Sequence, residues 1–191
     1  VGWAQTVPPC TLEITDAETF ARDWTVIDVN SNVSANTWAY NDGNAMYTQD
    51  KSNAADDWLI APAVTLEAGK AYKVSAYVKH SSTFGSDKQK IELKIGTAPT
   101  VEGLTTRLVY DESFQSRLFV EKSGTFSPAE SGVFYVGLRC YSESYNGDLY
   151  FQKIVIEEAP VYPAQITDLS IVAGERGAMS ATLSWTWPSS D

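Results

Sequence analysis

Apolar side chains recur at every second position over much of this chain, and helical periodicity is nearly absent. In residues 71–79, Tyr72, Val74 and Val78 alternate with lysine, serine and tyrosine, and residues 89–96 repeat the pattern with isoleucine and leucine. Because successive side chains of a strand point to opposite faces, this pattern predicts strands with one buried and one solvent-facing side. We expect further strands at residues 25–29, 58–61, 107–111, 118–125, 132–142 and 149–157.

Glycine-containing segments separate these predicted strands, as at residues 67–70, 84–87 and 128–132. Many strands of similar length joined by such turns are typical of an antiparallel sandwich or barrel. A short helical turn is expected only at residues 17–23, with Asp16 as its N-cap. The sequence therefore predicts an all-β fold, and 191 residues suffice for one large domain and a fragment of another.

The strand pattern ends at residue 158, which marks a predicted domain boundary. Residues 159–163 read Ala-Pro-Val-Tyr-Pro, a composition that favours a stiff connector between domains. Residues 164–191 resemble the start of a fibronectin type III domain, in which a Pro-rich entry precedes a strand with a core tryptophan, here Trp185. Such a domain needs about 90–100 residues. We therefore expect a domain at 1–158, a linker and a truncated second domain within a longer, multidomain protein.

The formal net charge of −10 excludes some classes of partner. Nucleic-acid backbones and anionic membrane surfaces require clustered lysine and arginine. An acidic surface suits cations and neutral ligands such as glycans. No apolar run approaches the roughly 20 residues needed to span a bilayer. The first residues lack the basic and apolar regions of a signal peptide, so we expect that any such peptide has been removed.

The chain contains two cysteines, Cys10 and Cys140, and no Cys-x-x-Cys pair. This spacing argues against a thiolate zinc site or a thioredoxin-like motif. One long-range disulfide would form in an oxidising compartment. The alternative is two separate buried thiols, because free cysteine is often an apolar core residue.

Three segments within residues 10–158 carry a resemblance to a known family. They are WTVIDVNSN at 24–32, ADDWLIAPAVTL at 55–66, and VFYVGLRCY at 133–141 with the hairpin strand that follows it. In this order they resemble the cleaved-adhesin or choice-of-anchor J domains of secreted Bacteroidetes proteins. The resemblance implies an antiparallel jelly-roll β-sandwich, an extracellular or cell-surface location and a role in adhesion.

The first of these segments is the candidate metal site. Asp28, Asn30 and Asn32 alternate, so a tight loop can direct their side-chain oxygens at one hard cation such as Ca²⁺. The resembling family often binds Ca²⁺ at a version of this loop with three aspartates, whereas two of the three positions here are amides. Asp56 is a fourth candidate ligand, and its neighbour Asp57 should point to the opposite face. The alternative is an Asx-rich turn whose side chains bond their own backbone.

The candidate ligand-binding residues are aromatic side chains in or beside predicted loops: Trp38, Tyr40, Tyr141 and Tyr145. Exposed flat rings stack on sugar faces, and neighbouring polar side chains can bond the hydroxyls. The alternative is that these rings cover the ends of the sandwich, because partly buried tyrosine and tryptophan are common in folded proteins.

Catalytic motifs are missing from the sequence. His80 is the only histidine, which excludes a three-histidine zinc site, and no nucleophile elbow or phosphate-binding glycine loop is present. We therefore predict a non-catalytic extracellular module that binds carbohydrate or a host or matrix protein, with Ca²⁺ as a stabilising ion. The alternatives are a structural spacer within a surface protein, or an ancillary domain of a secreted glycosidase or peptidase.

Overall fold

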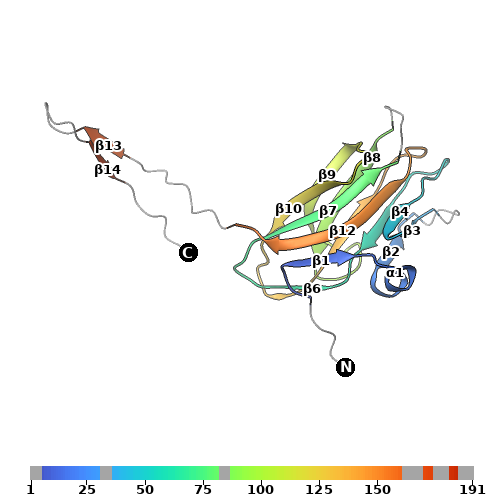
Figure 1. Cartoon of the computed structure of the whole chain (residues 1–191), viewed down its shortest axis with the longest axis horizontal. Coiled ribbons are helices and arrows are strands. Elements are labelled where there is room, and N and C mark those ends of the chain that lie inside the picture. The colour runs from blue at the N-terminus through green and yellow to red at the C-terminus, as the bar shows by residue number, and fades with distance from the viewer. Residues whose placement is uncertain (1–5, 31–35, 82–86, 161–169, 174–180, 185–191) are drawn as a thin grey trace, which may run out of the picture. The chain divides into compact units, whose positions relative to one another are not determined.

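The computed structural model of the chain describes residues 6–30, 36–81, 87–160, 170–173 and 181–184. The chain divides into two compact units, Val1–Ala159 and Pro160–Asp191. In the first unit, antiparallel strands form two six-stranded sheets (Figure 1).

Sheet A is built around the long strands β7 and β12, which lie side by side in Figure 1. Its order is β10-β7-β12-β4-β3, and β1 pairs with β12 on the same side as β4. The strands are β1 (Cys10–Glu13), β3 (Trp38–Asn41), β4 (Asn44–Tyr47), β7 (Tyr72–His80), β10 (Val120–Phe126) and β12 (Leu149–Glu158).

Sheet B is built around β11, and its order is β2-β5-β11-β8-β9. The short strand β6 also pairs with β11, beyond the end of β5. The strands are β2 (Thr25–Asp28), β5 (Asp57–Ile60), β6 (Val64–Leu66), β8 (Gln89–Gly96), β9 (Thr106–Phe114) and β11 (Gly132–Cys140).

The hydrophobic core fills the space between the two sheets. The apolar faces of β7 and β12 contribute Val74, Val78 and Phe151, and β8 contributes Leu93, each at most 1% exposed. Trp24 meets the Phe151 ring edge-on, with ring centroids 5.2 Å apart. The predicted all-β antiparallel sandwich is confirmed, because the alternation places one face of each strand in this core.

The helix α1 (Ala17–Asp23) forms where the sequence predicts it. Asp16 Oδ1 accepts a hydrogen bond from the Thr19 backbone N–H at 2.7 Å, which satisfies one of the free donors of the first turn. The helix ends before Trp24, whose ring is buried. No helix within the described residues is long and apolar enough to cross a membrane.

The second unit contributes one described hairpin, in which β13 (Ser170–Ala173) pairs with β14 (Ala181–Ser184). Ile171, Val172 and Leu183 in this hairpin are more than half exposed. Trp185 lies outside the described residues, so the resemblance to a fibronectin type III start stays a prediction.

Candidate functional site

One row of side chains crosses all five strands of the main path of sheet B on its outer side, which faces away from the main core. The strand register places each member directly opposite the next, and their neighbours along the strands point into the core. The row runs Ile27, Trp58, Arg139, Glu92 and Tyr110. This row joins residues up to 112 positions apart in the sequence, since it runs from 27 to 139.

The carboxylate at the centre of this row is nearly inaccessible to solvent. Glu92 is 2% exposed and accepts a hydrogen bond from Arg107 Nε at 2.6 Å. Arg139 Nη1 and Lys94 Nζ lie 3.5 and 3.6 Å from its oxygens. A buried charge is tolerated where cations surround it in this way, so Glu92 holds the cationic side chains of three strands in place.

Arg139 is held at both ends of its guanidinium. Its Nε and Nη2 donate to the two oxygens of Asp56 at 2.7 and 2.8 Å, and this bond to Asp56 raises the pKa of Arg139 further above its usual range. The same guanidinium lies over the rings of Trp58 and Tyr141, at 5.7 and 5.1 Å from their centroids. Arg139 therefore fixes the position of the Tyr141 ring.

Tyr141 and Tyr110 form the open end of this arrangement. Their rings stack with centroids 6.0 Å apart and planes inclined by 22°. The Arg107 guanidinium lies 4.7 Å from the Tyr110 ring centre, and the Tyr110 hydroxyl donates to Glu112 at 2.7 Å. Tyr110 is 50% exposed. We call Tyr110, Tyr141 and Arg107 the Tyr110 platform.

The other end of the outer face is covered by residues 97–105. Leu104 is 2% exposed and packs on Trp58 and Ile60 in a small second cluster. The close approach requires glycine beneath it, because a Cβ at Gly137 would lie 2.4 Å from Leu104 Cδ1 and one at Gly96 would lie 1.7 Å from the Gly103 carbonyl oxygen. Trp58 and Ile60 thus lie under this loop, while Tyr110 and the Arg107 side chain in the Tyr110 platform are at least half-exposed.

The four predicted ligand-binding aromatics lie in different environments. Tyr141 belongs to the Tyr110 platform, whereas Tyr145 is 62% exposed on the following loop, with a positive φ of 64°. Tyr40 is half-buried against the core. Trp38 is only 2% exposed, and its Nε1 donates to the Asp57 carbonyl oxygen at 3.2 Å. Trp38 is therefore a core residue in this structure, and its ring offers no open face.

Sequence reasoning missed Tyr110 and Arg107 as candidate site residues. Both lie on the predicted strand 107–111, but only the pairing of β8 with β9 shows that Tyr110 faces outward beside Glu92. The alternation of outward Tyr110 and Glu112 with inward Asp111 is the one signal in the sequence that marks this face.

The predicted metal ligands are also dispersed. Asp28 lies directly opposite Asp57 across the β2–β5 pair, and Asn30 Nδ2 donates to the Ala54 carbonyl at 2.7 Å. Asp56 is bound through both oxygens to Arg139. Asn32 lies outside the described residues. Among the side chains that the structure describes, no group of three or more His, Cys, Asp or Glu residues could hold a metal ion.

Asp57 points to the interior while Asp56 points outward, as strand alternation predicts. Asp57 is fully buried, and its Oδ1 has no hydrogen-bond partner among the described residues. Burial raises the pKa of this carboxyl to about 6, the Thr37 hydroxyl opposes the rise, and the charge of Asp28 adds to it.

The two cysteines are free thiols on different sheets. Cys10 lies on β1, and Cys140 lies in the core on β11, where its thiol donates to Gln89 Oε1 at 3.3 Å. Burial raises the pKa of Cys140 to about 12. Of the two alternatives for these residues, the structure contains the separate thiols.

The only histidine holds a loop. His80 is 1% exposed, and its Nε2 lies 2.5 Å from the carbonyl oxygen of Asn146. Gln89 Nε2 donates to the carbonyls of Asn146 and Gly147 at 3.1 and 2.6 Å. These bonds fix the loop between β11 and β12, which is a structural role.

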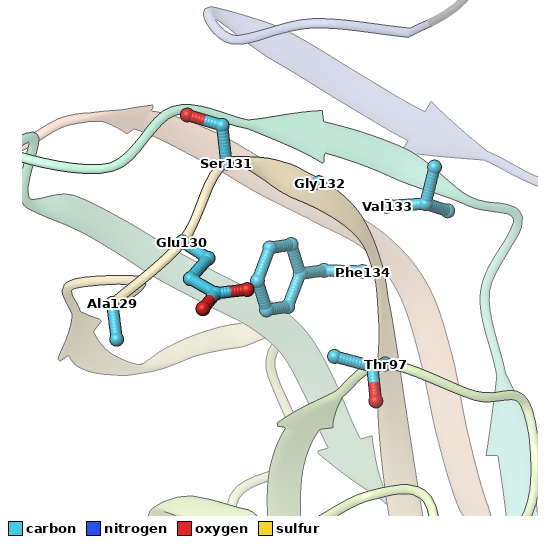
Figure 2. Close-up of a pocket in the computed structure, with 7 residues that line it drawn as sticks. All are labelled: Thr97, Ala129, Glu130, Ser131, Gly132, Val133 and Phe134. Carbon is cyan, nitrogen blue, oxygen red and sulfur yellow. The ribbon is translucent and has the colours of Figure 1, made fainter.

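Two hollows lie near residue 133. Figure 2 shows the first, of about 380 Å³, where the Glu130 carboxylate lies beside the Phe134 ring and Val133 points away. Most of its lining is one continuous segment, residues 129–134, which leads into the start of β11. The second, of about 600 Å³, is lined by several separate segments and includes Tyr135, Pro62 and Pro99.

Comparisons with known proteins bear on the sandwich. No protein-family model matches the chain, and no curated protein matches its sequence. The K3 cleaved adhesin domain of Lys-gingipain from Porphyromonas gingivalis W83 is similar, with a TM-score of 0.56 and 12% identity over 76% of this chain and 97% of that domain. The K1 cleaved adhesin domain of the same protein gives a TM-score of 0.55 and 14% identity over 79% of this chain and 99% of that domain.

A CBM4 structure, CBM denoting a carbohydrate-binding module, gives a TM-score of 0.51 and 15% identity over 78% of this chain and 94% of that chain. Identities this low carry no information on ligands. The structural similarity does show the fold, because the described sandwich is a jelly-roll β-sandwich of the kind found in cleaved adhesin domains and in this module.

Proposed function

We propose that this chain is a non-catalytic extracellular binding module that recognises carbohydrate through the Tyr110 platform. The observation that carries the proposal is the half-exposed Tyr110 ring, which is held beside Tyr141 by Arg107 and, through Tyr141, by Arg139. A ring fixed in this way loses little conformational freedom when a ligand stacks on it, so less of the interaction energy is offset by ordering.

Carbohydrate is the ligand class that suits these groups best. The C–H face of a pyranose packs on a flat aromatic ring, and planar side chains such as Arg107 and Glu112 bond its hydroxyls in pairs. The net charge of −10 disfavours nucleic acid. The likeness of the fold to cleaved adhesins and to a CBM4 module supports a binding role and a surface or secreted location.

The test is affinity electrophoresis in gels that contain laminarin, xylan, hydroxyethylcellulose or glucomannan. We expect at least one polysaccharide to retard the chain and Tyr110→Ala to weaken that retardation at least tenfold. The matched control is Tyr77→Ala, since Tyr77 is an outward-facing, half-buried ring under a lysine on sheet A. Equal retardation of both variants and the unmodified chain would remove the platform from the binding site.

We also propose that Ca²⁺ stabilises the sandwich through Asp28 and the loop that follows it. A carboxylate at Asp28, opposite the buried Asp57, places like charges across two strands, and a divalent cation would relieve their repulsion. Millimolar Ca²⁺ should raise the melting temperature, and Asp28→Ala should abolish the rise. An unchanged melting temperature in Ca²⁺ and in EDTA would contradict the proposal.

A further inference from the structure

The break between β5 and β6 opens a cleft on sheet B that is separate from the Tyr110 platform. Both strands pair with β11, and Ala61, Pro62 and Ala63 connect them. The Ala61 N–H still donates to the Val136 carbonyl at 2.8 Å, but proline has no N–H to continue the ladder. The chain therefore leaves β11 at this point and uncovers the side chain of Tyr135.

Segments far apart in the sequence form the walls of this cleft. They include Thr25 at the start of β2, Arg22 and Asp23 at the end of α1, and Pro99 in the covering loop. Thr65 lines it too, and its backbone N–H is fixed to the Thr6 carbonyl at 2.8 Å. The cleft is open to solvent on one side and has a volume of about 600 Å³, within the range of roughly 300–1,000 Å³ that is typical of small-molecule sites. We call it the Tyr135 cleft.

The lining combines the flat ring of Tyr135 with side-chain hydroxyl groups. Tyr135 packs against the cluster of Trp58, Ile60 and Leu104, which holds its ring in place at the cleft. Among the described residues, no hydrogen bond involves the side-chain hydroxyls of Tyr135, Thr25 or Thr65. These groups both donate and accept, so they match the hydroxyls of a sugar.

The charges at the rim cancel one another. Arg22 Nε and Nη2 donate to the two carboxylate oxygens of Asp23, each at 2.7 Å. A planar donor group and a planar acceptor group thus lie together with no net charge, which suits a neutral polyhydroxylated ligand better than an anionic one.

We infer that the Tyr135 cleft is a second binding site of this module, and that it takes one or two units of a neutral oligosaccharide. Tyr135 lies on β11 and Tyr141 directly follows this strand, so the two residues are six positions apart. At about 3.3 Å per residue of an extended strand, this separation is about 20 Å. The covering loop of residues 97–105 also lies on this outer face. The two sites therefore bind separate sugar units, and the module has two binding sites. The inference shares the ligand class of the proposed function but depends on different residues.

Isothermal titration calorimetry with cellotetraose, xylotetraose, laminaritetraose and mannotetraose, each used alone, tests this inference. For at least one probe we expect binding that persists in Tyr110→Ala and is weakened at least tenfold in Tyr135→Ala. Because Tyr135→Ala also removes packing, the second variant is Thr25→Val with Thr65→Val, which deletes two hydroxyls and keeps the β-branched shape. Its control is Thr125→Val on an exposed position of sheet A.

The outcomes separate the two sites. Weakening by Tyr135→Ala and by the double threonine variant, but not by Thr125→Val or Tyr110→Ala, supports the cleft as a second site. Equal weakening of the same probe by Tyr110→Ala and by the cleft variants would contradict two separate sites. Loss in Tyr110→Ala with unchanged binding in both cleft variants would overturn the cleft and leave the platform. Weakening by Tyr135→Ala alone, with the double variant unchanged, would reduce Tyr135 to a packing role and also overturn it. No heat with any of the four probes would overturn it as well.

Discussion

Replacing the buried Asp57 by asparagine should stabilise the sandwich at neutral pH. Asp57 is fully buried, and burial is the main reason that its pKa rises from 3.8 to about 6. The Thr37 hydroxyl lowers this pKa, and the charge of Asp28 raises it further. The difference between a pKa of 3.8 and one of about 6 corresponds to about 3 kcal/mol, because a tenfold change in proton affinity is worth about 1.4 kcal/mol. This is the free energy that ionising Asp57 removes from the folded state above pH 6 or so.

The sign follows from proton binding. Between pH 3.8 and about 6 the folded chain retains the Asp57 proton that the unfolded chain has lost. The contribution of this group is therefore fully present below pH 3.8 and disappears as the pH rises through about 6. Asp57→Asn has no such group, so it should exceed the unmodified chain by about 1–3 kcal/mol at pH 8, and the difference should vanish near pH 4.

The assay is urea unfolding at pH 4.5, 6 and 8 in EDTA, followed by tryptophan fluorescence. Asp111→Asn is the control, for which we expect a change in stability of the opposite sign. Burial raises the pKa of Asp111, but the hydrogen bonds from Lys122 and Ser113 and the charge of Lys122 lower it by more, so the net pKa is lowered. Removing that charge should therefore cost stability at pH 8. An Asp57→Asn variant that is no more stable at pH 8 than the unmodified chain, or whose advantage is the same at all three pH values, would refute the reasoning.

Three further predictions concern the loop, the core and the thiols. Gly96→Ala should lower the free energy of unfolding, measured in urea, by about 1–3 kcal/mol, because its Cβ would lie 1.7 Å from the Gly103 carbonyl oxygen. Gly132→Ala is the control and should change this free energy little, because a Cβ there has no atom within 4 Å. Equal effects of the two substitutions would contradict the placement of the loop. Phe151→Ala should cost about 3–5 kcal/mol in the same assay, because a fully buried ring leaves a cavity against Trp24; a loss below 1 kcal/mol would argue against that packing. Ellman's reagent should detect two thiols in the chain unfolded without reductant. In the folded chain at pH 8, Cys140 should not react, because burial shields its thiol and raises its pKa to about 12. Detection of no thiol after unfolding would indicate a disulfide.

The alternation of β7 and β8 was predictable because each strand has a face in the core and a face nearer solvent. Residues 71–79 and 89–96 were predicted, and β7 and β8 occupy Tyr72–His80 and Gln89–Gly96. The helix at Ala17–Asp23 was predictable too, since Asp16 is a strong capping residue and precedes it directly.

The sequence places Trp38 and Tyr40 in or beside a loop, whereas the structure places them on one strand of a hairpin. Asp42 and Gly43 both have positive φ, 45° and 76°, which is the turn that an Asp-Gly pair favours between two strands. Trp38 and Tyr40 therefore lie on β3, paired with β4, and not in a loop. Alternation across that hairpin puts the Trp38 ring in the core.

The Tyr110 platform could not be derived from the sequence, because it depends on the register between strands. Trp58, Arg139 and Glu92 become neighbours only once β5, β11 and β8 are paired. The same holds for Trp58 and Ile60, which lie on the outer face of sheet B and are covered there by Leu104. A period of two distinguishes the two faces of a strand without showing which face the chain later covers.

The most direct test of binding at the Tyr110 platform is chemical-shift mapping of the uniformly ¹⁵N-labelled chain, during titration with a polysaccharide fragment that retards the chain in gels. We predict shifts that saturate with ligand at Tyr110, Tyr141 and Arg107 and at their neighbours on the outer face of β8, β9 and β11, while the outward residues of β7 and β12 on sheet A stay unchanged. Saturating shifts confined to sheet A would contradict the assignment of the Tyr110 platform as the binding site.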